Sequence, residues 1–280
     1  MNATPDSLRQ AAAWVRNARK PVVFTGAGVS AESGIPTFRD AGGLWSKFPP
    51  EQFATWRGLM GVALRQPRRL ADFIVALLEP VAAAKPNAGH RAIAELGRCK
   101  TVTVITQNVD GLHQEAGSDD VWEVHGSLLQ IVDRQGRRVR CLSRDDLKAV
   151  MDAVRSAGEM SQPRRAIWSA MQPMFGVQAG KLHRPTIVLF GESMAEPDWS
   201  NALDAVRDCD CLIAVGTSGV VYPAAALPSD AQAAGAKVIT IDPTQPGWGL
   251  WLRGTAAEVL PEIVKAMVDS GPSPRGGGGA

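Results

Sequence analysis

A glycine-rich segment directly after a short apolar run constrains the fold of this chain more than any other feature. The run Pro21-Val22-Val23-Phe24 has the continuous hydrophobicity of a strand buried on both faces of a parallel sheet. The segment 26–40, GAGVSAESGIPTFRD, adds a glycine turn and small residues that can start a helix. Glycines let backbone amides approach a phosphate, and a helix dipole favours its charge. This order predicts a dinucleotide site, although the spacing differs from the plain G-x-G-x-x-G pattern.

Three further runs place polar residues directly after an expected strand or in an expected loop. The expected strand 101–105 leads into Thr106-Gln107-Asn108-Val109-Asp110-Gly111-Leu112-His113, and 122–127 reads WEVHGS. The expected strand 211–215 leads into the turn Gly216-Thr217-Ser218. Polar side chains at the carboxyl ends of strands mark the ligand site of an open α/β sheet. These runs therefore predict one site built from several strand ends.

Together, and in this order, the four runs resemble the sirtuin family, the NAD-dependent protein deacylases. The resemblance covers roughly residues 10–130 and 185–262. It implies an enzyme of the transferase class that cleaves the bond between nicotinamide and ribose in NAD, its co-substrate. The acyl oxygen of a modified lysine attacks the anomeric carbon, which yields nicotinamide, free lysine and 2′-O-acyl-ADP-ribose. An acyl-lysine protein is then the implied partner.

The resemblance also implies catalytic roles for residues of the second and third runs. His125 matches the base of the family, and histidine is the natural base near neutral pH. Asp110 would accept a hydrogen bond from the nicotinamide carboxamide, whose oxygen would meet the backbone amide of Ile35 or Asp110. Asn108 would hold a water molecule or the ribose, and Gln107 would touch the ribose hydroxyls.

Other positions would bind the rest of NAD. The pyrophosphate needs backbone amides and little bulk, which the two glycine turns supply. The residues assigned to it are Gly26, Ala27, Gly28, Gly216, Thr217 and Ser218. Phe38 would cover the cleaved ribose, and the Arg39 guanidinium would approach the phosphates or the ribose.

The adenosine half and the peptide complete the implied site. Asp242 follows the expected strand 237–241, and a carboxylate there accepts from both ribose hydroxyls and repels a 2′-phosphate, so NAD is favoured over NADP. Ala256 matches a small residue beside adenine. The residues expected to flank the acyl-lysine peptide are Phe190, Gly191, Glu192, Val220 and Val221.

The chain departs from the family between the histidine motif and residue 185. Most sirtuins hold zinc there with two Cys-x-x-Cys pairs, and four thiolates are a strong zinc signature. Here residues 131–184 contain one cysteine, Cys141, and His183 cannot complete a ligand set. We therefore expect no zinc and no metal ligands, and a subdomain packed by apolar helices. The expected apolar residues are Leu142, Leu147, Val150, Met151, Val154, Ile167, Trp168, Met171, Met174 and Phe175.

A second departure concerns the acyl group. One branch of the family removes succinyl or malonyl groups by using a tyrosine and an arginine three residues apart to bind the acyl carboxylate. Counting back from 82–87, these positions hold Ile74 and Leu77. Neither side chain can pair with a carboxylate, so we expect an apolar acyl pocket.

The chain of 280 residues fits one large α/β domain with inserts. The fold class that we expect is a doubly wound, parallel, Rossmann-like sheet with an inserted smaller, helical, zinc-free subdomain. The NAD-binding domain would comprise 7–40, 85–130 and 185–268, with a cofactor loop and helical module at 41–84, the atypical subdomain at 131–184 and a disordered tail at 270–280. The proline pair at 49–50 and the single prolines at 67 and 80 would break the module into short helices.

Further elements follow from periodicity. Helices are expected at 7–19, 88–96 (with Asn87 as N-cap), 198–208, 222–234 and 256–269, and a buried strand at 186–190.

Charge and cysteine usage limit the remaining options. A formal net charge of +2 gives no general reason to bind nucleic acid or a membrane. The amino terminus has no signal pattern, so a cytoplasmic protein is expected. Two alternatives remain open: an ADP-ribosyltransferase or NAD hydrolase on the same fold, and a non-catalytic NAD-sensing protein. An intact His125 favours deacylation over both.

Overall fold

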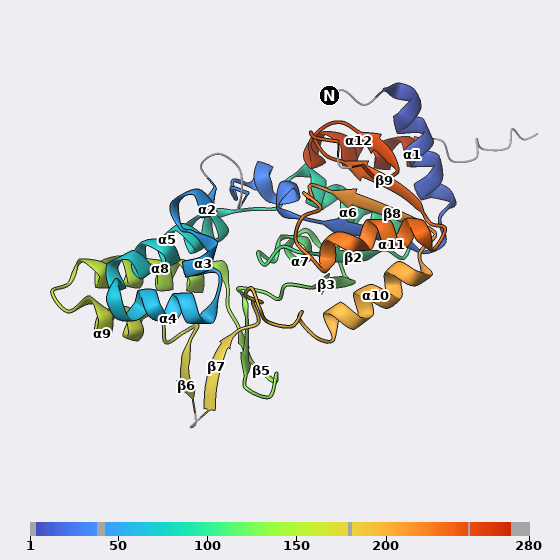
Figure 1. The fold of residues 1–280 in the computed structure, drawn as a ribbon. Helices are drawn as coiled ribbons and strands as arrows, with labels where there is room; N and C mark the ends of the chain where they lie inside the picture. The colour runs from blue at the N-terminus through green and yellow to red at the C-terminus, as the bar shows by residue number, and fades with distance from the viewer. Residues whose placement is uncertain (1–3, 38–42, 179–180, 246, 270–280) are drawn as a thin grey trace, which may run out of the picture.

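The computed structural model describes residues 4–37, 43–178, 181–245 and 247–269, and within them the largest sheet has six strands in parallel (Figure 1). The strand order is β10-β9-β8-β1-β2-β3. The bounds are β1 (Pro21–Thr25), β2 (Thr103–Thr106), β3 (Val121–Glu123), β8 (Cys211–Val215), β9 (Lys237–Ile241) and β10 (Leu250–Leu252). The strands expected at 21–24, 101–105, 211–215 and 237–241 are confirmed, with small shifts at their ends.

The chain starts in the middle of this sheet and winds outward in both directions. β1 pairs with β2 on one side and with β8 on the other, at Val23↔Val104 and Val23↔Ile213. The direction of winding reverses at β1, so the topological switch point lies at the carboxyl ends of β1 and its neighbours. The doubly wound α/β class is confirmed.

Helices cover both faces of the sheet. One face packs against α1 (Pro5–Asn17), α6 (Ala88–Cys99) and α12 (Ala256–Asp269), and the other against α10 (Asp198–Asp208) and α11 (Leu227–Ala233). Side chains of β1 alternate between the faces, because Val23 belongs to the first core and Val22 and Phe24 to the second. Asn87 caps α6 through its side chain, as expected. The short helix η2 (Ala224–Ala226) leads into α11.

The first glycine turn continues into the short helix η1 (Ala27–Ser33). Four helices follow between residues 43 and 83: α2 (Leu44–Lys47), α3 (Pro50–Phe53), α4 (Trp56–Arg65) and α5 (Pro67–Ala83). Pro50 and Pro67 begin helices, where a missing N–H costs nothing. The expected break at Pro80 was wrong, since α5 continues through it. Packing of α5 against α8 outweighs the lost hydrogen bond.

The inserted segment contains helices and a sheet, so the helical expectation was incomplete. The helices are α8 (Arg144–Glu159) and α9 (Pro163–Ala170). The sheet is antiparallel in the order β5-β4-β7-β6, with bounds β4 (Gln130–Asp133), β5 (Arg138–Cys141), β6 (Gly176–Gln178) and β7 (Lys181–Pro185). Most of the apolar residues expected to pack do so in a core shared with α5. Trp168 is the exception, with 56% of its surface exposed. The limits of the subdomain stay a prediction.

The buried strand expected at 186–190 was also wrong. This segment is irregular: Val188 donates its N–H to the His125 carbonyl at 2.9 Å, and Phe190 donates to Ala54 at 2.8 Å. Phe190 is 49% exposed. The apolar run lines a cavity and is not a strand of the sheet. Hydrophobicity alone does not distinguish a buried strand from an apolar cavity wall. The expected tail 270–280 lies outside the described residues.

Candidate functional site

The two glycine turns meet at the switch point of the sheet. Gly28 donates its N–H to the Gly216 carbonyl at 2.9 Å, and Gly26 donates to Val215 at 3.0 Å. A Cβ atom on Gly28 would lie 2.6 Å from the Gly216 Cα. Gly216 has φ +57, a conformation that favours glycine. Neither Gly28 nor Gly216 tolerates a side chain, so the backbone lines the site at these two positions.

A cavity of about 1140 Å³ begins at these turns and extends to α4, α5 and α9. It exceeds the roughly 300–1,000 Å³ of most small-molecule sites. The residues expected from the sequence that line it are Gly26, Ala27, Gly28, Gln107, Asn108, His125, Phe190, Gly191, Glu192, Gly216, Thr217, Ser218, Val221, Asp242 and Ala256. Among the described residues expected at the site, Ile35, Asp110 and Val220 do not line it. Phe38 and Arg39 lie outside the described residues.

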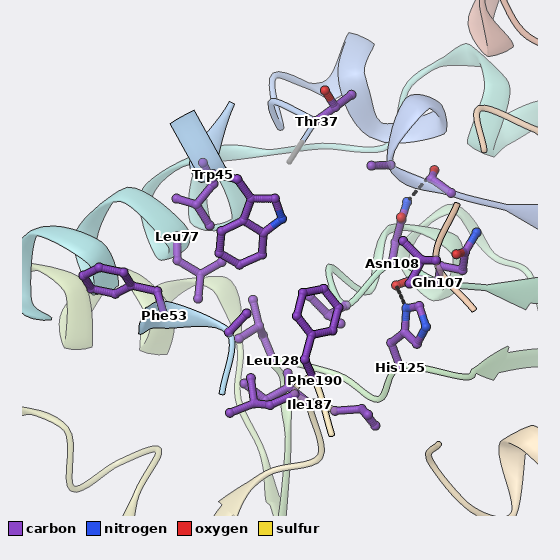
Figure 2. Close-up of a pocket in the computed structure, with 18 of the residues that line it drawn as sticks. Thr37, Trp45, Phe53, Leu77, Gln107, Asn108, His125, Leu128, Ile187 and Phe190 are labelled. Atoms are coloured by element: carbon purple, nitrogen blue, oxygen red, sulfur yellow. Dashed lines mark hydrogen bonds between the residues drawn. The ribbon is translucent and has the colours of Figure 1, made fainter. Parts of the chain in front are cut away.

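His125 faces the cavity with its orientation fixed by a backbone contact. Its Nδ1 atom lies 3.1 Å from the Gln107 carbonyl oxygen (Figure 2). Because a carbonyl only accepts, Nδ1 must carry the proton, and Nε2 then holds a lone pair. Burial lowers the pKa of His125 below its ordinary value of 6.5, opposed by the bond to Gln107. The imidazole is thus neutral at pH 7 and able to accept a proton.

Asn108 and Asp110 are joined through Ser30, which the sequence reasoning missed. Asn108 Nδ2 donates to the Ser30 Oγ and to the Gly26 carbonyl, each at 3.1 Å. Ser30 Oγ donates to Asp110 Oδ2 at 2.7 Å, and the Leu112 N–H donates to Oδ1 at 2.9 Å. Burial raises the pKa of Asp110. Asp110 therefore lies in a second layer behind Asn108. Ser30 is buried, and its position within the glycine-rich segment 26–40 was the only signal in the sequence.

Two buried histidines extend this layer. The rings of His90 and His113 lie 4.9 Å apart between centroids, and His113 Nε2 is 2.9 Å from Thr25 Oγ1. His90 Nε2 lies 3.5 Å from Ser30 Oγ. Burial lowers the pKa of His90 to about 4 and that of His113 to about 3. Both rings are neutral at pH 7, so Asp110 has uncharged polar neighbours on this side.

The far end of the cavity is formed by β9 and α12. Asp242 and Ala256 line it, and Asp242 Oδ1 accepts from the Thr244 N–H at 2.8 Å. Glu32, which the sequence reasoning did not select, lines the same end and accepts from the Ala257 N–H at 3.0 Å. Two carboxylates here disfavour a further anionic group.

The opposite end of the cavity is apolar. In Figure 2 the polar residues Gln107, Asn108 and His125 lie on one side, and the apolar residues lie on the other. The labelled apolar residues are Trp45, Phe53, Leu77, Leu128, Ile187 and Phe190. Ile74 and Leu77, expected from the sequence to make an apolar pocket, both line the cavity. Arg164 of α9 also lines it and donates to the Leu64 carbonyl at 2.5 Å.

No group of three or more His, Cys, Asp or Glu side chains in the described ranges could hold a metal ion. Cys141 is exposed on β5, and His183 is buried with Nε2 at 3.1 Å from the Gln172 carbonyl. No helix in the same ranges is long and apolar enough to cross a membrane.

The fold and the site define a nucleotide-binding α/β protein with a neutral histidine at the switch point. The Sir2 family model matches residues 26–223, and this chain belongs to the Sir2 family. An NAD-dependent protein deacylase of Desulfosudis oleivorans is 38% identical over 273 residues, which is 94% of this chain and 96% of that protein.

Two solved structures show the same fold at substantial identity. A Sir2 homologue in complex with NAD has a TM-score of 0.74 and 32% identity, and the match covers 93% of this chain and 94% of that one. Sir2Af2 bound to a myristoylated histone peptide has a TM-score of 0.68 and 30% identity, and the match covers 95% and 98%.

Proposed function

We propose that this protein is an NAD-dependent protein-lysine deacylase. The observation that carries the proposal is the neutral His125, whose Nδ1 is bound to Gln107 on the wall of a cavity that starts at two glycine turns. The deacylase activity named for the Desulfosudis relative supports it. The relative and the chain share almost their full lengths, so the comparison concerns the whole enzyme.

NAD is the co-substrate. The glycine turns offer backbone to the pyrophosphate, and the related complex with NAD supports this placement. Asp242 accepts from the adenosine ribose hydroxyls, and it disfavours NADP because its carboxylate would repel a 2′-phosphate. Phe38 and Arg39 keep their proposed roles at the cleaved ribose and the phosphates.

The chemistry needs one base. The acyl oxygen of the modified lysine attacks the anomeric carbon, and nicotinamide leaves with the electrons of the broken bond. His125 Nε2 then takes the proton of a ribose hydroxyl, whose oxygen attacks the acyl carbon. The lysine amine leaves after protonation, and water completes 2′-O-acyl-ADP-ribose. Asn108, on the cavity wall, holds the ribose or a water molecule. Asp110 and Ile35 do not line the cavity, and they bind the carboxamide when nicotinamide enters the layer behind Asn108.

The apolar end of the cavity selects the acyl group. Ile74 and Leu77 offer no partner to an acyl carboxylate, so acetyl and longer apolar groups are preferred over succinyl and malonyl. The myristoylated peptide bound by Sir2Af2 supports a long apolar chain as a substrate. Phe190, Gly191, Glu192, Val220 and Val221 flank the peptide.

The small subdomain works without zinc in this proposal. A structural zinc site needs four thiolate or imidazole ligands, and 131–184 offers Cys141 and His183. The core shared by α8, α9 and α5 replaces the metal as the source of stability. The cytoplasmic location and the lack of nucleic-acid and membrane partners stay predictions.

Product analysis tests the function. The purified protein is incubated with NAD and an acetyl-lysine peptide, and products are identified by mass spectrometry. O-acetyl-ADP-ribose with free lysine peptide is expected. An ADP-ribosylated peptide, or ADP-ribose with the peptide still acetylated, would instead show a transferase or hydrolase.

A further inference from the structure

One arginine of the inserted subdomain joins it to the loop that carries Asp110. Arg144 is the first residue of α8, three positions after Cys141, in the stretch that departs most from the family pattern. Its side chain is 18% exposed. Ser143 fixes the start of the helix through a capping box with Asp146, so the backbone at Arg144 is well defined.

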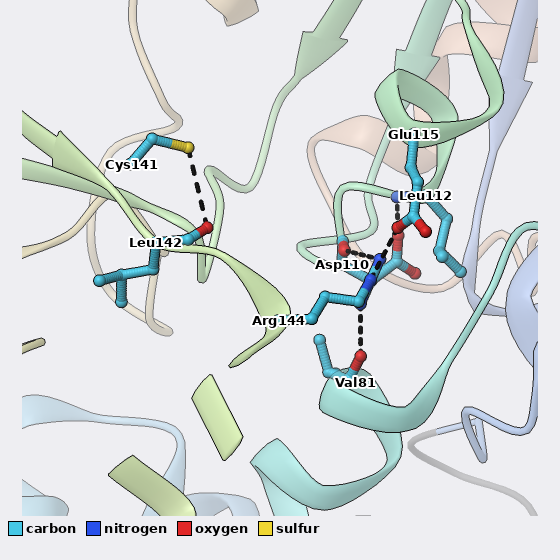
Figure 3. Close-up of polar contacts among 7 residues, drawn as sticks. All are labelled: Val81, Asp110, Leu112, Glu115, Cys141, Leu142 and Arg144. Carbon is cyan, nitrogen blue, oxygen red and sulfur yellow. Dashed lines mark hydrogen bonds and ion pairs between the residues drawn. The ribbon is translucent and has the colours of Figure 1, made fainter. Parts of the chain in front are cut away.

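The guanidinium contacts three elements at once (Figure 3). Its Nη2 donates to the Asp110 carbonyl at 3.1 Å, and its Nε pairs with Glu115 Oε2 of α7 (Leu112–Ala116) at 2.7 Å. Its Nη1 donates to the Val81 carbonyl. Val81 belongs to the last turn of α5, where carbonyls lack helical partners and a cation is favourable. The planar fork of arginine suits three acceptors in different directions.

The contact with Asp110 bears on the carboxyl group of the same residue. The chain turns sharply after it, because Gly111 has φ +71. The carboxylate reaches Ser30 and the Leu112 N–H only if the Asp110 backbone keeps its orientation. Arg144 holds the carbonyl side of that backbone, and its charge opposes the rise in the Asp110 pKa that burial causes.

We propose that Arg144 is a positioning residue, which fixes the loop 108–111 and thereby sets the affinity of the site for nicotinamide and for the nicotinamide end of NAD. The proposal rests on the proposed function, in which Asp110 binds the nicotinamide carboxamide. It also makes α8 part of the machinery that shapes the nicotinamide pocket. The acyl-peptide end of the cavity depends on other residues and should not respond.

Arg155 provides a matched control on the same helix. It pairs with Glu79 of α5 at 2.7 Å, so it also ties α8 to α5, and its side chain is 45% exposed. Arg144→Gln and Arg155→Gln thus remove the same charge from the same helix. Glutamine keeps hydrogen-bonding capacity but cannot contact three elements. Arg144→Lys keeps the charge on a single ammonium group, which cannot satisfy all three acceptors.

Binding of NAD and of nicotinamide is measured by calorimetry, together with the KM for an acetyl-lysine peptide and the melting temperature. Arg144→Gln should weaken both small ligands by about ten-fold or more, while the peptide KM changes less than about two-fold. Arg155→Gln should change every value by less than about two-fold. Arg144→Lys should bind NAD and nicotinamide more weakly than the wild type, by a smaller factor than Arg144→Gln. If Arg144→Gln does not fold, Arg144→Lys takes its place in the comparison.

Equal effects of the two glutamine variants would overturn the proposal, as would a peptide KM that rises as much as the nicotinamide constant. If Arg144→Lys bound NAD and nicotinamide as tightly as the wild type, the three contacts of the guanidinium would not be required. Failure of the proposed function is distinguishable. A wild-type protein that binds NAD without deacylating would end that function and leave the comparison of NAD and nicotinamide affinities between the Arg144 and Arg155 variants valid. A wild-type protein that binds neither ligand would end both proposals.

Discussion

The Nδ1 atom of His125 lies 3.1 Å from the carbonyl oxygen of Gln107, and this contact fixes which nitrogen faces the cavity. The side chain of Gln107 in turn donates to Thr217 Oγ1 at 3.0 Å. The histidine is therefore tied, through one residue, to the glycine turn that follows β8. His125 and the turn Gly216-Thr217-Ser218 are thus connected across the carboxyl ends of β3, β2 and β8.

His125→Ala should abolish deacylation and leave NAD binding within a few-fold, because the imidazole acts after nicotinamide departs. Loss of a general base costs about 10² to 10⁴ in rate. Turnover is followed by release of free lysine peptide, with NAD affinity and melting temperature as controls. Deacylation at the wild-type rate would show that His125 is not the base.

The pH dependence follows from the sign of the His125 shift. The neutral form is the active one, so the rate falls as pH drops through the pKa in the folded protein. Burial lowers that pKa from 6.5, and the midpoint of the acid limb of kcat/KM should lie below pH 6.5. A profile between pH 4.5 and 8 measures it, and a midpoint above 6.5 contradicts the assignment.

The glycine turns at the switch point could be predicted because each turn directly follows an apolar strand in the chain. Gly26, Gly28 and Gly216 follow apolar strands, and the structure brings the two turns together as the parallel order requires. His125 needed the resemblance, since one histidine among four has no local signal. Ser30 was missed because its role depends on Asp110, a residue 80 positions away.

The errors concern apolar residues whose partners are not local. The segment 186–190 has strand-like hydrophobicity, yet its side chains line the cavity. Trp168 was expected in the subdomain core and is exposed, since helical spacing alone does not say which face of α9 meets α8. Pro80 stays inside α5 because tertiary packing overrides a local rule. In the four-stranded sheet of the insert, β4 pairs with β7 about 50 residues further along the chain, as in Ile131↔Pro185, and periodicity cannot reveal such a pairing.

Asp110→Asn should weaken inhibition by nicotinamide and slow base exchange. The variant replaces an acceptor-only carboxylate with an amide that also donates, so Ser30 and the ligand no longer meet a pure acceptor. A loss of roughly ten-fold in nicotinamide affinity is expected for a hydrogen bond to a charged group. Nicotinamide inhibition equal to that of the wild type would contradict the pocket assignment.

Acyl preference should follow from Ile74 and Leu77. Specificity constants for acetyl-lysine and for longer apolar acyl-lysine peptides should exceed that for succinyl-lysine by roughly 10²-fold or more, since an unpaired buried carboxylate costs several kcal/mol. The double variant Ile74→Tyr, Leu77→Arg should raise succinyl turnover and lower acetyl turnover. Comparable constants for succinyl and acetyl peptides in the wild type would defeat this prediction.

Zinc content gives an independent test. The purified protein should contain no stoichiometric zinc, and a chelator should leave both its activity and its melting temperature unchanged. The reason is the ligand count, because Cys209 and Cys211 are buried free thiols and Cys99 directly precedes the loop into β2. About one zinc per chain after chelator treatment would contradict this prediction and show that the insert folds around a metal site.

The most direct measurement is the identity of the nucleotide product of a single turnover. Enzyme in excess is mixed with NAD and an acetyl-lysine peptide, quenched, and separated for mass spectrometry, with His125→Ala alongside. The account predicts O-acetyl-ADP-ribose and free lysine peptide in equal amounts for the wild type, and neither for the variant. ADP-ribose with an unchanged acetyl peptide, or an ADP-ribosylated peptide, would contradict deacylation as the function of this protein.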